Sequence, residues 1–337
     1  MIGRIFLILL AIFTAVAPLP SGLVEREYSS TLYPKIQAVV TPMSNAFPFA
    51  ALDILVVFGV TIVLAILLRR RRILNLLAFA ALVWLVFLAL WGLNYRRVPL
   101  ESKLSVSPQT GSAEALFMTA VKELNALAPR AHAAEWPQFD VVAARLTDPF
   151  GKVRQALGLP MDIVDAVPKR SMLTPYFRAA AIDGFTDPFL LETIVNPDVL
   201  PFERPSVVAH EWGHLAGLAD ESEATFAGWL MCLRGGDQAR YSGWLALYPH
   251  LVTAVGIERG QQLGKALGPK PREDLRAIYE RFQQSSEKVR EGANRTYDKF
   301  LKANRVEKGI ESYDAVVSLI TKVRFGNDFS PVLRPGS

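Results

Sequence analysis

The sequence has 337 residues, of which 51% are hydrophobic, and its formal net charge at pH 7 is +5. This length exceeds one small domain, and the apolar fraction exceeds that of most soluble proteins. The charge is modest and gives no indication of an acidic partner. Because Cys232 is the one cysteine of the chain, an internal disulfide is excluded.

Apolar residues are concentrated at the start of the chain, in three stretches. They are Ile5–Leu19, Phe47–Leu68 and Ile73–Leu93, and the third has the length that a helix needs to cross the hydrocarbon layer. The first stretch is similar to a signal peptide, but Pro18 argues against cleavage, so we interpret it as a retained anchor. Residues 1–95 are therefore predicted to form a membrane region with about three transmembrane helices, whose partner is the lipid bilayer.

Four consecutive arginines, Arg69 to Arg72, separate the second and third apolar stretches. The positive-inside rule places such a turn in the cytoplasm, and everything after Leu93 then lies outside. A tight turn between two spans leaves little room for a nucleic acid, so we expect no nucleic-acid partner. The sequence predicts an integral membrane protein whose domain after Leu93 is periplasmic or extracellular.

The composition after Leu93 is that of a soluble domain. Residues 96–111 are rich in proline and polar residues and are predicted to be a linker, and residues 326–337 a loose tail. Between them, residues 112–325 form the predicted catalytic domain. Helical periodicity is found at 112–128, at 139–157 and over most of 272–320, whereas short apolar runs such as Leu190–Val195 suit strands.

The most informative pattern is an HExxH motif at His210, Glu211 and His214, in a predicted helix from about Pro205 to Ala216. Residues four apart share one face of a helix, so the two imidazoles can bind one Zn²⁺ ion. Glu211 can take a proton from a zinc-bound water and return it to a leaving group. The pattern predicts a zinc hydrolase, which still needs a third protein ligand.

Three carboxylates that follow the motif are candidates for the third ligand: Asp220, Glu221 and Glu223. Asp220 would complete a variant metzincin pattern, whereas Glu221 begins a Glu-x-x-Ala segment that is similar to the gluzincins. Gly217 is placed as a helix C-cap and Asp220 as the next N-cap, with Glu223 as its capping-box partner. We therefore favour Glu221 and keep Glu223 as the alternative.

The chain resembles a family of uncharacterised bacterial membrane proteins that have about three N-terminal spans and a C-terminal zincin-like domain. The resemblance covers five segments: Trp91–Tyr95, Gly184–Phe189, His210–Ala224, Tyr297–Asn304 and Gly309–Tyr313. It implies an α+β fold, in which N-terminal transmembrane helices precede a mainly helical zincin-like metalloprotease domain with a small sheet. It also implies zinc at His210, His214 and a glutamate of the Glu221/Glu223 pair. Zincins bind substrate on an edge strand, for which Glu192–Val195 is our candidate.

These observations predict a membrane-anchored, zinc-dependent metallopeptidase whose substrates are proteins or peptides outside the cytoplasm. Four side chains are candidates for contacting the oxyanion of the reaction: Tyr297, Tyr313, Arg295 and His250. Two alternatives remain open. One is a catalytically inactive zincin-fold membrane scaffold, and the other is a zinc amidase that acts on cell-wall material.

Overall fold

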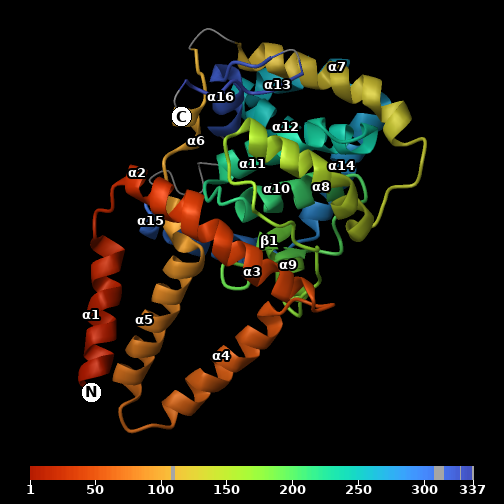
Figure 1. Ribbon diagram of the computed structural model, residues 1–337. Helices are drawn as coiled ribbons and strands as arrows, with labels where there is room; N and C mark the ends of the chain where they lie inside the picture. Colours follow the sequence, from red (N-terminus) through yellow and green to blue (C-terminus); the bar gives the residue numbers. More distant parts are fainter. Residues whose placement is uncertain (108–110, 307–314, 327, 336–337) are drawn as a thin grey trace.

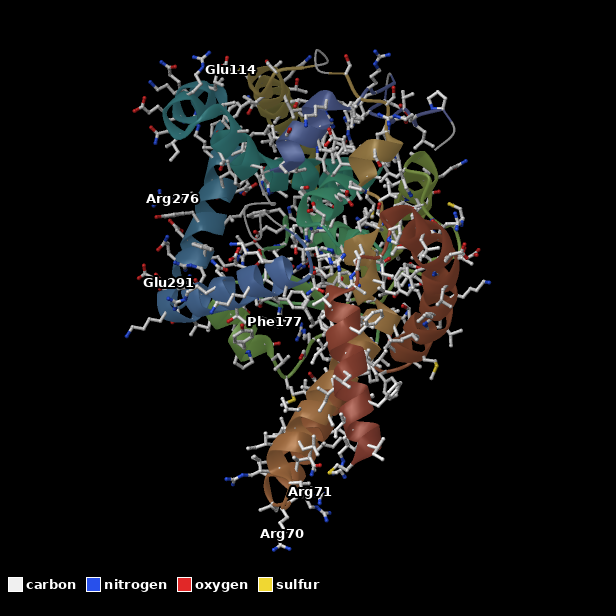
Figure 2. The ribbon with its side chains drawn as sticks, turned by 90° about the vertical axis from the view of Figure 1, so that its left-hand side faces the viewer. Arg70, Arg71, Glu114, Phe177, Arg276 and Glu291 are labelled. Atoms are coloured by element: carbon white, nitrogen blue, oxygen red, sulfur yellow. The ribbon has the colours of Figure 1, made fainter. Side chains whose placement is uncertain are left out.

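The computed structural model describes residues 1–107, 111–306, 315–326 and 328–335. Most of them are helical, and one small sheet of two strands lies among the helices. Three helices, α1, α4 and α5, project from one side of a helical domain (Figure 1). The turn that joins α4 to α5, with Arg70 and Arg71, lies at the end of these helices that is remote from the domain (Figure 2).

The elements follow one another along the chain with short connections. In order they are α1 (Ile2–Val16), α2 (Ser21–Leu23), the π-helix η1 (Val24–Leu32), α3 (Tyr33–Asn45), α4 (Leu52–Leu67), α5 (Arg72–Leu90), the 3₁₀ helix η2 (Gly92–Arg96), α6 (Leu100–Lys103), α7 (Ala113–Ala131), α8 (Phe139–Ala156), α9 (Thr174–Ala180), β1 (Gly184–Thr186), β2 (Thr193–Val195), α10 (Arg204–Leu215), α11 (Glu221–Leu233), α12 (Asp237–Val255), α13 (Ile257–Leu263), the 3₁₀ helix η3 (Gly264–Ala266), α14 (Pro269–Gln283), α15 (Glu287–Ala303) and α16 (Ala315–Lys322).

Among the described helices, α5 is by itself long and apolar enough to cross a membrane. It has 19 residues, close to the ~20 that a span needs. Helix α4 is apolar but has 16 residues. Helix α1 meets the same test only together with the helix Ser21–Asn45, and the two are bent by 108° at their junction. The structure therefore shows one candidate span, and three spans stay a prediction.

The helix Ser21–Asn45 lies between the projecting helices and the domain and was not predicted from the sequence (Figure 1). Its part α3 is attached through polar side chains. Gln37 exchanges hydrogen bonds with the main chain of Val164, and the Thr41 hydroxyl donates to the carbonyl of Leu191 at 2.8 Å. On the opposite side, Val39 and Met43 are exposed. Helix α3 therefore buries polar side chains beside apolar ones and leaves other apolar side chains exposed.

The domain is built around α10 and α11, which lie against each other and are covered by α8 and α12 (Figure 1). Large side chains of these helices are almost completely buried, among them Trp212, Phe226 and Trp244. Burying one large apolar side chain contributes roughly 1.5–3 kcal/mol, so these residues hold α10 and α11 in place. The helices predicted near 112–128, 139–157 and 205–216 are confirmed as α7, α8 and α10.

The sheet lies beside α10, and its arrangement corrects one expectation. Strands β1 and β2 are antiparallel, with Phe185 opposite Ile194. On its other side, β2 is bridged by Lys169, which also pairs with Ile194. Because β2 has neighbours on both sides, Glu192–Val195 cannot be a free edge that binds substrate. The outer strand is β1.

The predicted linker and the predicted tail lie beside each other in the structure. Leu104 forms a bridge with Leu333, and Val106 forms one with Val323. The main chain of Arg334 also donates to the carbonyl of Lys103. The described part of the tail is therefore hydrogen-bonded to the segment that leads from α5 into the domain.

A buried ion pair attaches α4 to the sheet. The Lys169 ammonium lies 2.9 Å from the Glu192 carboxylate, and the exposed fractions of the two side chains are 2% and 0%. Glu192 also accepts hydrogen bonds from the main-chain N–H groups of Ala51 and Leu52, which are otherwise unpaired at the start of α4. One carboxylate thus joins the sheet, a buried lysine and an apolar helix.

Replacing Lys169 by methionine leaves Glu192 buried without its counter-charge. We expect Lys169→Met to lower the free energy of unfolding by about 3–5 kcal/mol, measured by urea denaturation of the purified full chain with tryptophan fluorescence. The matched control is Lys152→Met, which removes an exposed pair with Asp148 and should cost at most about 1 kcal/mol. Equal effects of the two substitutions would show that the buried pair does not attach α4.

Candidate metal centre

The two histidines of the motif lie on one face of α10, and their rings are 4.8 Å apart. The helix begins with a proline in its first turn and ends at a Schellman turn. In that turn Gly217 has a φ of +84°, its N–H donates to the carbonyl of His214, and the N–H of Leu218 donates to that of Gly213. The predicted C-cap is confirmed, and it reverses the chain directly after His214.

Helix α11 begins at Glu221, four residues after Gly217, and brings this carboxylate to the histidines. The Asp220 side chain accepts the N–H groups of Ser222 and Glu223, which confirms it as the N-cap. A carboxylate oxygen of Glu221, Oε2, lies 3.2 Å from Nε2 of His210 and 3.2 Å from Nε2 of His214. These three residues form a group that could hold a metal ion, with their ligand atoms within 4.8 Å of one another.

Glycines allow α10 and α11 to approach backbone to backbone. A Cβ atom on Gly213 would lie 2.8 Å from the carbonyl oxygen of Ala224, and one on Gly228 would lie 2.9 Å from the main-chain nitrogen of His210. Any larger residue would separate the helices. The short reach of Glu221 to the histidines therefore depends on both glycines.

The second nitrogen of each imidazole is held by a neighbour. His214 Nδ1 lies 2.8 Å from the carbonyl oxygen of Leu218, and His210 Nδ1 lies 3.2 Å from the hydroxyl of Thr225. A carbonyl can only accept, so Nδ1 of His214 carries the proton and its Nε2 has a free lone pair when the ring is neutral. Both rings thus present Nε2 to Glu221, as metal-binding histidines do.

Glu221 and His210 differ in their access to solvent. The exposed fraction of the side chain is 3% for Glu221, 10% for His214 and 25% for His210. Burial alone would raise the pKa of Glu221, but the two imidazoles hold the pKa of this carboxylate well below its usual range. The group is therefore enclosed, with an approach on the side of His210.

Glu211 points toward β1 and lies close enough to both histidines for their charges to act on it. It is buried, and the Thr186 hydroxyl donates to its Oε2 at 2.7 Å. A Cβ atom on Gly184 would lie 2.5 Å from its Oε1, so the strand leaves room for this carboxylate only because residue 184 is glycine. Burial raises the pKa of Glu211 above its ordinary value.

Glu223, the alternative third ligand, lies elsewhere. It is on the first turn of α11, and its Oε1 accepts the N–H of Leu100 at 2.6 Å. This contact replaces the predicted capping-box bond to the main chain of Asp220. Glu223 instead caps the start of α6, in the segment that leads from α5 into the domain.

Of the four oxyanion candidates, Tyr297 lies at the cluster, where its hydroxyl donates to Oε1 of Glu221. It belongs to α15, as does Arg295, which is exposed, whereas His250 belongs to α12. Tyr313 lies outside the described residues, together with the rest of Gly309–Tyr313.

Three residues that precede the predicted catalytic domain contact the end of α10 and the turn after it, and the sequence analysis assigned them no role. Trp91, directly after α5, donates from Nε1 to the carbonyl of His214 at 3.3 Å. The Tyr33 hydroxyl donates to the carbonyl of Leu215 at 2.7 Å, and Arg97 donates to that of Gly217 at 2.9 Å. The signal available in the sequence was the Trp91–Tyr95 segment of the resemblance.

A family model described as a protein of unknown function (DUF3810) matches residues 28–321, which include α3 to α5 and the whole candidate metal centre. Comparison with curated proteins gave no match. Comparison with solved structures gave none either. The matched family carries no metallopeptidase description, so the argument for function depends on the geometry of the site.

The same substitution at each of the two glutamates of α11 shows which of them is the third zinc ligand. We expect Glu221→Gln to weaken zinc binding at least about 100-fold, because loss of a ligand costs more than loss of an outer contact. Glu223→Gln keeps an acceptor for the N–H of Leu100 and should leave the affinity unchanged. Competition with a chelating dye measures both. Loss of zinc in Glu223→Gln with retention in Glu221→Gln would show that Glu223 is the ligand.

Proposed function

For this chain, which belongs to the DUF3810 family of proteins of unknown function, we propose the activity of a membrane-anchored, zinc-dependent metallopeptidase. The observation that carries the proposal is the convergence of His210, His214 and Glu221 on one point, with Glu211 beside it. Two imidazole nitrogens and one carboxylate oxygen are a ligand set of catalytic zinc sites, which keep a fourth position open. The partial exposure of His210 supports such an open position.

The residues around the cluster fit the division of labour in such a reaction. A zinc ion at this site would supply Lewis acidity, which lowers the pKa of a water molecule and polarises a carbonyl group. Glu211 accepts the proton of the attacking water and delivers it to the amine as the C–N bond breaks. Thr186 holds Oε2 of this carboxylate, which leaves Oε1 for the transferred proton.

Tyr297 is our candidate for the donor that stabilises negative charge on the carbonyl oxygen. Its hydroxyl already lies at the cluster, against Glu221. Its ring is held by stacking on Phe300, with the centroids 6.0 Å apart and the planes at 16°. A hydroxyl placed before the reaction begins needs little reorganisation, which is the main source of this kind of stabilisation.

Strand β1 supplies a place for an extended peptide. The main chain of Phe185 pairs with Ile194 of β2. The next hydrogen bonds between these two segments lie two residues away on either side, from Asn196 to Asp183 and from Asp187 to Glu192, so every second residue is bonded to the other segment. The main-chain groups of Gly184 and Thr186 therefore point away from β2. A substrate strand could add to this edge directly beside Glu211.

The membrane location is part of the proposal. Helix α5 is the candidate span, and the arginine turn that precedes it would lie in the cytoplasm by the positive-inside rule. The domain that follows α5 would then lie outside the cytoplasm. The Glu211 carboxylate is buried and held by the Thr186 hydroxyl, whereas the structural carboxylate of Glu192 has the counter-charge of Lys169, and this difference favours turnover over an inactive scaffold. An amidase for cell-wall material would use the same chemistry.

Removing the proposed base should abolish turnover and leave the metal in place. We expect Glu211→Gln to lower kcat/KM about 10²–10⁴-fold while zinc content is retained, because the amide cannot accept the proton. The assay uses purified full chain in detergent, stoichiometric zinc, and a mixture of soluble and lipidated internally quenched peptides. Glu258→Gln, on the exposed surface of α13, is the control. Undiminished cleavage by Glu211→Gln would exclude the role of this residue.

A further inference from the structure

The candidate metal centre lies at the end of the candidate span. Trp91 follows α5 directly and donates to the main chain of His214. Phe87, in the last turn of α5, packs on Phe300 with the ring centroids 5.7 Å apart. Phe300 in turn stacks on Tyr297, which contacts Glu221. The end of α5 is therefore connected to the metal-binding group through Trp91 and through the rings of Phe300 and Tyr297.

The start of α4 approaches the same site from the other side of the sheet. Glu192 accepts the N–H of Leu52 at 2.7 Å and directly precedes β2. Its neighbour Thr193 lies opposite Thr186, which donates to Glu211. The site is thus enclosed between the domain ends of two apolar helices that leave the domain on the same side (Figure 1).

Large apolar side chains are exposed around the start of α4. We call this group the apolar collar, and its members are Phe47, Phe49, Met172, Tyr176 and Phe185, with exposed fractions between 38% and 57%.

Contacts within the structure connect these side chains to α4. The main-chain N–H of Met172 donates to Asp53 in the first turn of α4. The ring of Phe177 contacts Tyr176 and Phe185, and Phe177 belongs to the same buried cluster as Leu52. Phe177 lies at the edge of the domain from which the apolar helices project (Figure 2). The collar therefore surrounds the point where α4 enters the domain.

Two further observations identify what covers the collar. It is continuous with α4 and α5, whose side chains are exposed along their length, as lipid-facing side chains would be. Leu32 at the end of η1 and Val39 and Met43 of α3 add an exposed apolar face next to the same helices. Aromatic side chains at the ends of membrane helices and amphipathic helices beside them are the features that proteins place in the interfacial layer of a bilayer.

We propose that the apolar collar lies in the interfacial layer of the bilayer, so that the metal centre opens at the membrane surface and acts on membrane-anchored polypeptides close to their anchor. The substrate part of this inference rests on the proposed function. Strand β1 connects the candidate metal centre to the apolar collar. Its Gly184 and Thr186 face Glu211, while Phe185 points to the opposite face and belongs to the collar. A chain added to the edge of β1 lies along the lipid surface.

The depth of the collar can be measured without any activity. Three variants of the full chain with one added cysteine each, Phe49→Cys, Tyr176→Cys and Phe185→Cys, would carry a spin label in vesicles of phosphatidylethanolamine and phosphatidylglycerol. Ile257→Cys is the matched control, an apolar residue of 69% exposure on α13, on the far side of the domain. Wild-type protein serves as the labelling blank because Cys232 is buried.

The expected result is that collar positions are more accessible to dissolved oxygen and less accessible to a water-soluble nickel chelate than Ile257→Cys. Collar positions with the accessibility of Ile257→Cys would overturn the proposal. Because this measurement needs no turnover, it stands even if the peptidase activity is absent.

A pair of lipidated peptides tests the substrate class. Both carry the same internally quenched segment and the same acyl anchor, and they differ in the spacer, which is either a few residues or about 20 proline-rich residues, roughly 60 Å long. In vesicles, we expect the short-spacer peptide to be cleaved at least about tenfold faster, because the spacer sets the local concentration at the site.

Equal rates, or faster cleavage with the long spacer, would overturn the substrate class. Cleavage of neither peptide by wild type, in vesicles or in detergent, would contradict the peptidase function itself and leave the depth result standing. The two failures are thus distinguishable.

Discussion

The candidate site depends on the direct contact between α10 and α11 across one left-handed turn. Gly217 reverses the chain after His214, and three residues later Asp220 starts the next helix. Gly213 and Gly228 then allow the two backbones to touch. Under these constraints the first residue of α11 is the one whose carboxylate reaches both imidazoles. The Glu221 side chain reaches both imidazoles only while the two helices touch. A single methyl group between the helices would move its carboxylate away from the histidines.

The N-terminal helices and the segment that follows α5 are attached to this site at several points. Trp91 and Tyr33 donate to main-chain carbonyls at the end of α10, and Arg97 donates to Gly217 while its guanidinium also pairs with Glu25. The last turn of α10 has carbonyls that no intrahelical N–H can satisfy, so these donors complete it. The apolar helices are therefore part of the support of the histidines, and the position of the domain relative to α5 is determined by the same contacts.

Much of the site was predictable because its signals are local. Helical spacing places His210 and His214 on one face, and the glycine and aspartate between the helices mark a C-cap and an N-cap. Glu221 was favoured over Glu223 on this basis, and Glu221 is the one that lies against the histidines. The partner of Glu223, by contrast, is Leu100, more than a hundred residues away, and no local pattern could have shown it.

Parts of the fold were not predictable, for physical reasons. Helix α3 buries Gln37 and Thr41 and exposes Val39 and Met43, so a search for an apolar buried face overlooks it. The outer position of β1 depends on the bridge between Lys169 and Ile194, a contact over 25 residues. Likewise, Tyr297 reaches Glu221 from α15, at a distance of 76 residues along the chain.

The central claim, that His210, His214 and Glu221 hold a zinc ion, is tested most directly by X-ray absorption at the zinc edge on the purified full chain. The account predicts one bound zinc with two imidazole ligands at about 2.0–2.1 Å and carboxylate and water oxygens at about 2.0–2.2 Å. It also predicts that the imidazole contribution disappears in a variant that lacks both histidines. Protein that binds no zinc when one equivalent is supplied, or bound zinc without imidazole ligands, would contradict the claim.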